Sequence, residues 1–378
     1  MVEVGSNVIP FELHRIRTLM EPEPGDPAES EGVLNPGAAR GPDGTLYLFP
    51  RLVARGNYSR IGIARVLFDD AGDPIGVERL GIALEPEAPY ELRADGGGCE
   101  DPRITRVEPI GLYVMTYTAL SERGPRIALA LSEDLLRWRR LGLATFEPHD
   151  GLRFDEVPNK DALVFPVAIP APDGRPAMAL IHRPLYPGTE APETAQQPMS
   201  RAVDLPRESM WIAYCSLAPA GHGDLHHLCH FTMHHRLAAP VAPWERLKIG
   251  GGTPPLLTPH GWLMLYHGVS ESLMAEPTGR PRGLRYSAGA LVLDRQDPRL
   301  IRYRSAEPVL SPELAFEHSG VVPDVVFPTA VDRREDLSQP ERVDVYYGMA
   351  DARIGVARLD LPTALPPVAC ADPPMGRV

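Results

Sequence analysis

The sequence of 378 residues predicts an all-β protein, built as a five-bladed β-propeller. Short apolar runs alternate with turns, and the 43 prolines and 34 glycines are spread along the chain without forming one low-complexity block. Long amphipathic helical patterns are hard to find, which ranks an α/β fold lower. A pair of strand-like runs recurs five times, as expected for radial β architectures.

Each pair consists of two neighbouring apolar runs, which we interpret as a hairpin. The first runs cover residues 45–49, 111–117, 177–182, 261–267 and 343–348. The second runs cover residues 59–64, 126–131, 210–215, 286–293 and 352–357. We therefore expect a single propeller domain over residues 1–378, with terminal extensions at about 1–30 and 363–378. The competing architectures are a two-sheet sandwich and two smaller β domains.

Charge and composition exclude several classes of function. With 50 acidic and 38 basic residues the net charge is −12, and no basic run could follow a nucleic-acid backbone. No signal peptide or membrane-spanning segment is recognisable, so we expect a cytoplasmic protein without a membrane partner. Neither a disulfide framework nor a zinc ribbon is indicated by the four scattered cysteines, Cys99, Cys215, Cys229 and Cys370.

Residues 96–104 carry the strongest local signal. Three glycines allow the backbone to approach a ligand closely, and Pro102 is expected to keep Asp101 in an extended conformation. Glu100 and Asp101 are thereby held in a loop that we interpret as an active-site loop. The alternative is a surface turn in which Arg103 pairs with one of the two acids.

A propeller binds its ligand at the axis, so functional residues should recur near the first run of each repeat. Polar residues at these places are Asn35, Arg51, Asp101, Arg103, Lys160, Asp161, His182, Arg183, Tyr266, His267, Asp324 and Asp351. Four of them, Arg51, Lys160, Arg183 and His267, form a cationic set in an acidic chain, which predicts an anionic ligand such as phosphate. Individually, Lys160 also suits a solvated turn, and His267 a hydrogen-bonded core histidine.

Eight segments in order resemble glycoside hydrolase family 130. They are residues 34–38, 99–103, 159–162 with 165–166, 182–184, 266–268, 286–290, 322–328 and 347–351. The resemblance extends from about residue 30 to about residue 360. It implies a five-bladed β-propeller that acts on β-mannosides, in most members as an inverting phosphorylase releasing α-mannose 1-phosphate and in a minority as a hydrolase.

The resemblance also implies roles for individual residues. Asp101 matches the general acid, which protonates the leaving oxygen through the 3-hydroxyl of the bound mannose, and Glu100 is its neighbour. Phosphate-binding positions match Lys160, Arg183, His267 and Tyr286. We expect contacts with the substrate from Asn35, Arg51, Glu100, Arg103, Asp161, Asp324 and Asp351. No metal or organic cofactor is implied, inorganic phosphate is the co-substrate, and homo-oligomer formation is left open.

Two departures from the family pattern keep hydrolysis as an alternative. An inverting hydrolase needs an acid and a base about 6.5–9.5 Å apart to activate water, whereas phosphate is already a competent nucleophile. Pro36 stands where some members have serine, and Asp324 stands where many have asparagine. The alternatives are therefore an inverting β-mannosidase that uses Asp324, Glu100 or another acid as base, and a propeller without catalysis, which binds carbohydrate or is a scaffold for a protein partner.

Two further regions are weighed separately. The histidines and Cys229 within residues 226–235 suit either a zinc site or an edge strand with exposed rings. Loops at residues 186–208 and 270–284 are expected to form the subsites for the leaving group. Loop sequences carry no readable code for a sugar, so the linkage and chain length of the mannoside stay open.

Overall fold

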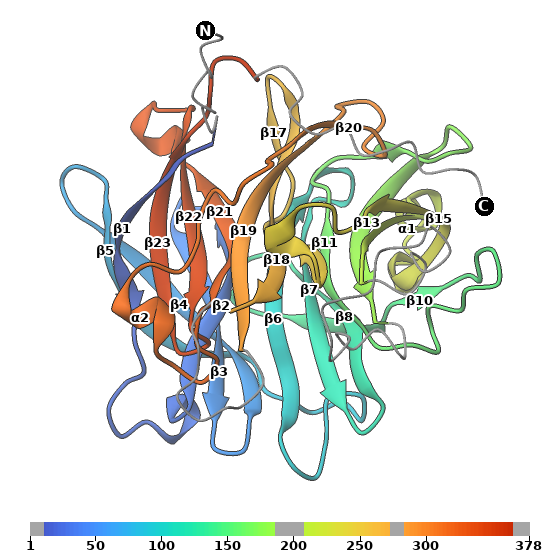
Figure 1. The fold of residues 1–378 in the computed structure, drawn as a ribbon. Coiled ribbons are helices and arrows are strands. Elements are labelled where there is room, and N and C mark those ends of the chain that lie inside the picture. Colours follow the sequence, from blue (N-terminus) through green and yellow to red (C-terminus); the bar gives the residue numbers. More distant parts are fainter. Residues whose placement is uncertain (1–10, 186–207, 273–282, 366–378) are drawn as a thin grey trace, which may run out of the picture.

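The computed structural model describes residues 11–185, 208–272 and 283–365. Figure 1 shows that this part of the chain is built from strands with only short helical segments, so the predicted all-β class is confirmed. Its strands form sheets of four, six, five and eight strands. The largest sheet consists of two antiparallel halves that meet in one short parallel pairing, Tyr58 with Gly97 and Ser59 with Gly98. We therefore describe five consecutive units, which are antiparallel except for one short parallel pairing in the third, Thr145 with His230 and Phe146 with Phe231.

Each unit takes its strands from a continuous stretch of chain, except the last. Unit 1 contains β2 (Gly32–Arg40), β3 (Leu46–Ala54), β4 (Tyr58–Phe68) and β5 (Pro74–Leu84). Unit 2 contains β6 (Gly97–Val107), β7 (Leu112–Ser121), β8 (Gly124–Ser132) and β9 (Arg139–Leu143). Unit 3 contains β10 (Thr145–Phe146), β11 (Asn159–Val164), β12 (Ile169–Pro170), β13 (Pro176–Pro184), β14 (Met210–Ser216) and β15 (His230–Ala238).

Unit 4 contains β16 (Lys248–Gly251), β17 (Leu256–Thr258), β18 (Gly261–Glu271), β19 (Leu284–Leu293) and β20 (Ile301–Arg304). Unit 5 contains β21 (Val326–Arg333), β22 (Arg342–Met349), β23 (Arg353–Asp360) and, from the other end of the chain, β1 (Leu13–Met20). The described helical segments are α1 (Ala218–Gly221), α2 (Ala315–His318), η1 (Pro27–Glu29), η2 (Glu108–Ile110), η4 (His226–Cys229), η5 (Pro243–Glu245) and η6 (Glu335–Leu337). None of these is long and apolar enough to cross a membrane.

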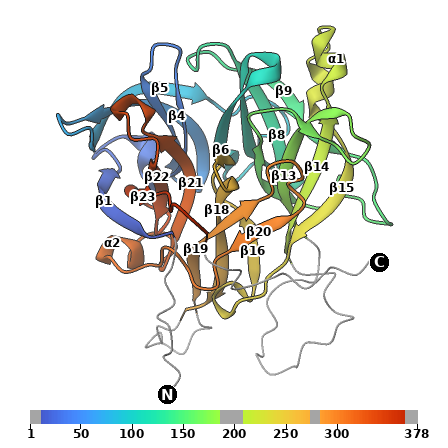
Figure 2. The ribbon, with the colours of Figure 1, turned by 90° about the horizontal axis from the view of Figure 1, so that it is seen from above.

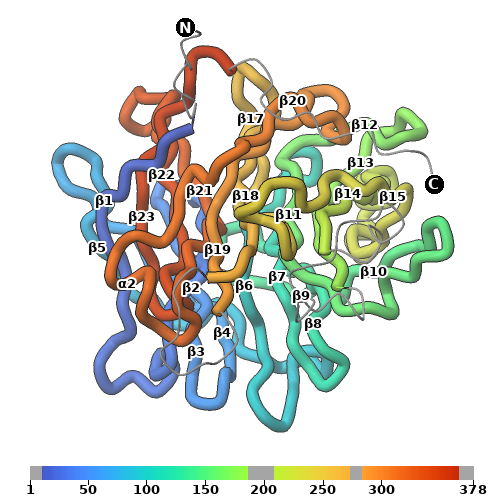
Figure 3. The backbone as a smooth tube through the Cα atoms, viewed as in Figure 1, coloured from blue at the N-terminus to red at the C-terminus, as the bar shows by residue number. Residues whose placement is uncertain are grey.

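The two ends of the described chain meet in unit 5. β1 pairs antiparallel with β23, for example Leu13 with Leu359, and this completes the sheet. Figure 3 shows the blue N-terminal segment beside the red C-terminal strands. Seen from above in Figure 2, the units follow one another around the molecule, with β6, β18 and β21 near its middle, where β21 contacts both of the others.

All five hairpins expected from the sequence are present. They are the antiparallel pairs β3/β4, β7/β8, β13/β14, β18/β19 and β22/β23. In each unit, however, a further strand pairs with the first strand of the hairpin; these strands are β2, β6, β11, β16 and β21, and we call them the first strands. The sequence interpretation missed them because they are rich in polar residues, glycine and proline. The predicted loop at residues 96–104 lies mostly in such a strand, β6. Both Glu100 and Asp101 are buried there, so the surface-turn alternative is wrong.

Glycine allows units 1 and 2 to meet closely. At Gly98 the backbone φ is 113°, and a Cβ atom would lie 2.1 Å from the carbonyl oxygen of Ser59. The parallel pairing of β4 with β6 therefore requires a residue without a side chain at this position.

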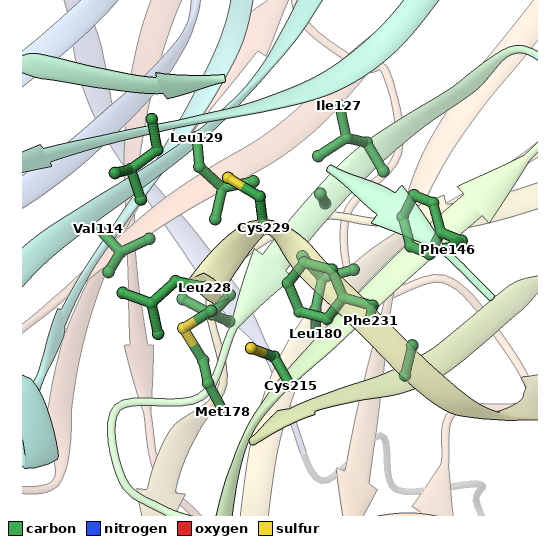
Figure 4. Packing of buried hydrophobic residues seen from close by; sticks show 14 of the residues in the cluster. Val114, Ile127, Leu129, Phe146, Met178, Leu180, Cys215, Leu228, Cys229 and Phe231 are labelled. Atoms are coloured by element: carbon green, nitrogen blue, oxygen red, sulfur yellow. The ribbon is translucent and has the colours of Figure 1, made fainter. Parts of the chain in front are cut away.

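Five clusters of buried apolar side chains lie between consecutive units, and one of them joins unit 5 to unit 1. Figure 4 shows part of the cluster between units 2 and 3, in which Leu129 of β8 and Leu180 of β13 pack with Phe146 and Phe231. Because each fully buried aliphatic side chain contributes about 1.5–3 kcal/mol, these clusters hold neighbouring units face to face.

In four units a buried glutamate that precedes the first strand binds an arginine of the outermost strand. This contact connects the two parts of the unit. In unit 4, Glu245 accepts hydrogen bonds from Arg304 of β20 at 2.7 Å and from the hydroxyl of Tyr266 at 2.8 Å. Glu91 is bound in the same way by Arg140 and Tyr117, and Glu317 by Arg15 and Tyr347. Unit 1 has the pair Glu29 and Arg79 without a tyrosine. We call this arrangement the Glu–Arg lock.

Unit 3 has no such pair among its described residues. Tyr117 of β7 lies opposite the register shift between Glu100 and Arg103 in β6. His182 of β13 lies opposite the equivalent register shift in β11. His182 thus takes the place of the tyrosine, and it hydrogen-bonds Asn159 at 3.0 Å.

The lock makes a testable contribution to stability. Glu245→Gln takes the carboxylate away from Arg304, and both side chains are almost fully buried. Because an uncompensated buried charge is costly, we expect the free energy of unfolding to fall by about 3 kcal/mol, measured by chemical denaturation. The control is Glu78→Gln, which breaks the exposed pair with Arg65 and should leave the denaturation midpoint unchanged. Equal stability of the two variants would contradict a role for the lock.

Candidate active site

The first strands of units 1, 2 and 3 each carry a β-bulge at one polar residue. The bulged residues are Asn35, Asp101 and Asp161, with φ angles of 43°, 47° and 58°. Asparagine and aspartate tolerate this left-handed region better than most residues, and a bulge redirects a side chain out of the regular alternation. The expectation that Pro102 keeps Asp101 extended is therefore wrong, because the bulge determines the conformation of the residue before the proline.

A cavity of about 300 Å³ lies at the bulges. Most of the predicted site residues line it: Asn35, Arg51, Asp101, Lys160, Arg183, His267, Tyr286 and Asp351. The others in its lining are Pro125, Leu185, Glu208, Lys248, Val322, Val325 and Phe327. Units 1 to 5 all contribute, so the structure brings together residues that are up to about three hundred positions apart in sequence.

Asp101 is held by groups that favour its charged form. Asn35 donates a hydrogen bond to its Oδ1 at 2.9 Å, Arg51 donates to the same atom at 3.2 Å, and the Lys160 Nζ lies 4.0 Å from Oδ2. Burial by itself would raise the pKa of Asp101, but Arg51 and Lys160 nearby keep it below the usual value. With these partners Asp101 is thus a carboxylate near pH 7.

The second buried acid, Asp161, lies behind the cavity. It accepts a hydrogen bond from Arg183 Nε at 2.6 Å, and its Oδ2 is 3.6 Å from His267 Nε2. Burial opposes its ionisation, but Arg183 and His267 are among the groups that hold the pKa of Asp161 far below its usual value. Gly250 makes this packing possible, because a Cβ there would lie 2.4 Å from Asp161 Oδ2.

His267 does not belong to the cationic set in which the sequence interpretation placed it. Burial, together with the nearby Arg183 and Arg103, lowers the pKa of His267 to about 3, although Asp161 opposes this. The imidazole is therefore neutral near pH 7. Neither of its ring nitrogens has a hydrogen-bond partner among the described residues, so one N–H can serve a ligand.

Four predicted substrate-binding residues do not line the cavity: Glu100, Arg103, Asp161 and Asp324. Glu100 pairs with Arg51 Nη2 at 2.7 Å. Arg103 donates to the carbonyl oxygens of Asp101 at 2.9 Å, Gly252 at 3.1 Å and Gly251 at 3.2 Å, so it fixes the backbone that carries the acid.

Asp324 lies outside the cavity and has partners of its own. Its Oδ1 is 2.5 Å from His318 Nδ1, and its Oδ2 accepts a hydrogen bond from Ser272. These two contacts outweigh burial and lower the pKa of Asp324. The main-chain carbonyl of Asp324 accepts a hydrogen bond from the Tyr286 N–H at 2.9 Å, which places the tyrosine at the cavity.

Two charged residues of the lining were missed from the sequence. Lys248 belongs to β16, and its Nζ lies 5.7 Å from the ring centroid of Tyr286 and 3.9 Å from Glu208 Oε2. Burial and the neighbouring Arg183 lower the pKa of Lys248. Its place in the first strand of unit 4, beside three glycines, is a signal that could have identified it. Glu208 is the last residue of the loop 186–208 that was predicted for the leaving-group subsites, and it stands in no recognisable motif.

Asp351 differs from the other acids. Burial and the nearby Asp101 raise the pKa of Asp351 to about 6, although Arg51 acts in the opposite direction. It therefore changes its protonation state just below neutral pH, unlike Asp101.

The residues 226–235 do not form one cluster. Cys229 packs in the apolar cluster between units 2 and 3, and His234 lies between the rings of Phe154 and Phe146, with centroid distances of 4.6 and 5.9 Å. Within the described residues no group of three or more histidine, cysteine, aspartate or glutamate side chains could hold a metal ion. The predicted leaving-group loops at 186–208 and 270–284 lie largely outside the described residues.

Comparison with known proteins gives the family. The sequence model of glycoside hydrolase family 130, described as beta-1,4-mannooligosaccharide phosphorylase, matches residues 8–365. The chain belongs to this family. Within family 130 it is 31% identical over 326 residues to a 1,2-beta-oligomannan phosphorylase of Thermoanaerobacter sp. (strain X514), covering 84% of this chain and 87% of the relative.

Two further family 130 comparisons agree. A Beta-1,2-mannobiose phosphorylase from the same Thermoanaerobacter strain is 30% identical over 291 residues, which are 76% of this chain and 74% of the relative. The structure of the Beta-1,2-Mannobiose phosphorylase from Listeria innocua, in complex with beta-1,2-mannobiose, has a TM-score of 0.65. It is 23% identical, with 92% of this chain and 97% of that chain covered, and supports the fold.

The buried side chain of His234 should make stability depend on pH. Burial lowers the pKa of His234 to about 4, whereas an unfolded histidine titrates near 6.5. The unfolded chain therefore binds a proton that the folded chain does not, and stability is lost as pH falls below about 6.5. Between pH 7 and pH 5 we expect this residue to cost about 2 kcal/mol in the free energy of unfolding.

The measurement is chemical denaturation of the wild type and of His234→Gln at both pH values. The variant should lose about 2 kcal/mol less than the wild type on acidification. An identical loss in both proteins would show that His234 does not contribute to the pH dependence.

Proposed function

We propose that this protein is an inverting β-mannoside phosphorylase, which uses inorganic phosphate to release α-mannose 1-phosphate from short manno-oligosaccharides. The observation that carries this proposal is the cavity itself, where one buried acid, Asp101, shares the lining with Lys160, Arg183 and Lys248. Family membership supports the same reaction, since two relatives over most of the chain are named as mannoside phosphorylases. The cationic side chains provide position and charge neutralisation for a phosphate nucleophile.

In the proposed reaction a phosphate oxygen attacks C1 of the mannosyl residue while the bond from C1 to the leaving oxygen breaks. Asp101 supplies the proton that the leaving oxygen takes up, through the sugar 3-hydroxyl. The proton carried by hydrogen phosphate then restores Asp101. Attack from the side opposite the leaving group inverts the anomeric centre, and only one protein acid is required.

Phosphate binding would also prepare the acid for its role. In the ligand-free cavity Arg51 and Lys160 keep the pKa of Asp101 low. A phosphate on Lys160 offsets this positive charge and adds a negative one, and both effects raise the pKa of a neighbouring carboxyl group. A protonated Asp101 is thus favoured when the nucleophile is in place.

Tyr286 and His267 complete the proposed phosphate site, and Lys248 joins it on the basis of its place in the lining. Asn35, Arg51 and Asp351 are proposed to contact the mannosyl residue. We also propose that the five units are the blades of one five-bladed β-propeller, because each apolar cluster joins consecutive units and one joins unit 5 to unit 1.

The hydrolase alternative is less well supported. Its proposed bases, Glu100 and Asp324, do not line the cavity and are engaged by Arg51 and by His318 with Ser272. Among the described residues of the lining, the carboxylates besides Asp101 are Glu208 and Asp351. A binding protein without catalysis would not require a buried acid beside several cations.

The proposal is tested by the products and by the acid. With short β-mannosides and phosphate, the wild type should release mannose 1-phosphate, measured by chromatography. Asp101→Asn removes the proton donor and should lower kcat at least about 100-fold. The control is Asp324→Asn, which should keep most of the activity. Release of free mannose alone, independent of phosphate, would make the protein a hydrolase.

The phosphate site has its own test. Arg183→Ala removes a guanidinium group from the cavity, and we expect the KM for phosphate to rise at least about tenfold, whereas the KM for the mannoside changes much less. Steady-state kinetics with each substrate varied in turn separates the two constants. A rise in the KM for the mannoside alone would move Arg183 to the sugar site.

A further inference from the structure

Every cation that lines the cavity is already paired with a carboxylate. Arg51 contacts Glu100 and Asp101, and Lys160 lies 4.0 Å from Asp101. Arg183 is bound by Asp161 and Glu208, and Lys248 lies 3.9 Å from Glu208. The carboxylates thus offset most of the positive charge of the proposed phosphate site, so phosphate competes with them for these cations.

Most of these carboxylates are fixed. Asp161 has a fully buried side chain, and it holds the Nε side of Arg183 from behind the cavity. Glu100 and Asp101 lie in β6, with side chains that are 6% and 3% exposed. None of the three can turn away without leaving a buried charge uncompensated.

Glu208 is different in position and in exposure. It precedes β14 in a segment that is not a strand, lines the cavity, and has a side chain that is 16% exposed. A partly exposed carboxylate that leaves its cations can be solvated by water, whereas a fully buried one cannot.

Glu208 also lies where an anion would be expected. Asp161 binds Arg183 through Nε, and this leaves the Nη groups of this cavity-lining residue for other partners. There the Oε2 atom of Glu208 accepts from Arg183 Nη1 and faces Lys248 Nζ. One carboxylate oxygen is therefore placed between two cations of the proposed phosphate site, as a phosphate oxygen would be.

We propose that Glu208 is an internal competitor of phosphate, which occupies Arg183 and Lys248 in the ligand-free enzyme and is displaced when phosphate binds. This inference rests on the proposed function. Glu208 then sets the phosphate affinity, because the free energy of phosphate binding is reduced by that of the contact it replaces. Until phosphate binds, Glu208 also prevents other anions from binding to Arg183 and Lys248.

The test is phosphate binding in the absence of any sugar. Isothermal titration calorimetry with inorganic phosphate should give a Kd about tenfold lower for Glu208→Gln than for the wild type, or ~1.4 kcal/mol. The KM for phosphate should fall by a similar factor, whereas kcat changes much less. Glu208→Asp keeps the charge and should stay closer to the wild type. The matched control for the loss of one negative charge is Glu78→Gln, because Glu78 forms an exposed ion pair with Arg65 and does not line the cavity.

The outcomes separate this inference from the proposed function. Unchanged or weaker phosphate binding by a folded Glu208→Gln, with mannose 1-phosphate still formed, would overturn the competitor role alone. A tenfold gain in Glu78→Gln as well would reduce the effect to net charge and overturn it too. If the wild type binds no phosphate and releases free mannose, both proposals fail. If Glu208→Gln then no longer releases free mannose, Glu208 is the base that activates water in a hydrolase. Folding of each variant is checked by its thermal melting temperature.

Discussion

The pairing of buried carboxylates with guanidinium groups is the interaction on which this structure depends. At the cavity, Asp101 and Asp161 are held by Arg51 and Arg183, and towards the outer strands the Glu–Arg lock repeats the same pairing in four units. Charges without partners cannot be buried at acceptable cost, so these residues constrain one another's positions, within a unit in each lock and between units 1 and 2 at Arg51 and Asp101. The price in desolvation is offset by hydrogen bonds that also fix the geometry of the site. Stability and function are therefore coupled through the same kind of contact.

Much of the site could be predicted because its residues recur at one place in each repeat. Asn35, Asp101, Lys160 and Arg183 were identified in this way, and all of them line the cavity. The apolar hairpins were predicted from their pattern for the same reason. The first strand of each unit was missed, because a strand at the centre carries polar side chains and bulges, and its sequence looks like a loop. Position in the repeat was thus a better guide than local hydrophobicity.

Other features could not be inferred from sequence because they arise from packing. Glu100, Arg103 and Asp324 belong to the same motifs as the lining residues, yet each is turned towards partners behind or beside the cavity. His267 looked like a cation, but burial among Arg183, Arg103 and Lys248 keeps it neutral. Glu208 had no pattern at all. The direction in which a side chain points, and whether it is protonated, depend on neighbours that are distant in sequence.

The pairing of β1 with β23 has a consequence for how the protein folds during its synthesis. Among the described strands β1 is synthesised first, but its partner strand follows more than three hundred residues later. Until then, β1 lacks the strand with which it forms its ladder of hydrogen bonds, and contacts of such high sequence separation form slowly. Early units can fold as they emerge, whereas the cavity, which draws on all five units, acquires its final shape only after translation has reached the last strand. Chaperone dependence and aggregation during synthesis should therefore centre on this late step.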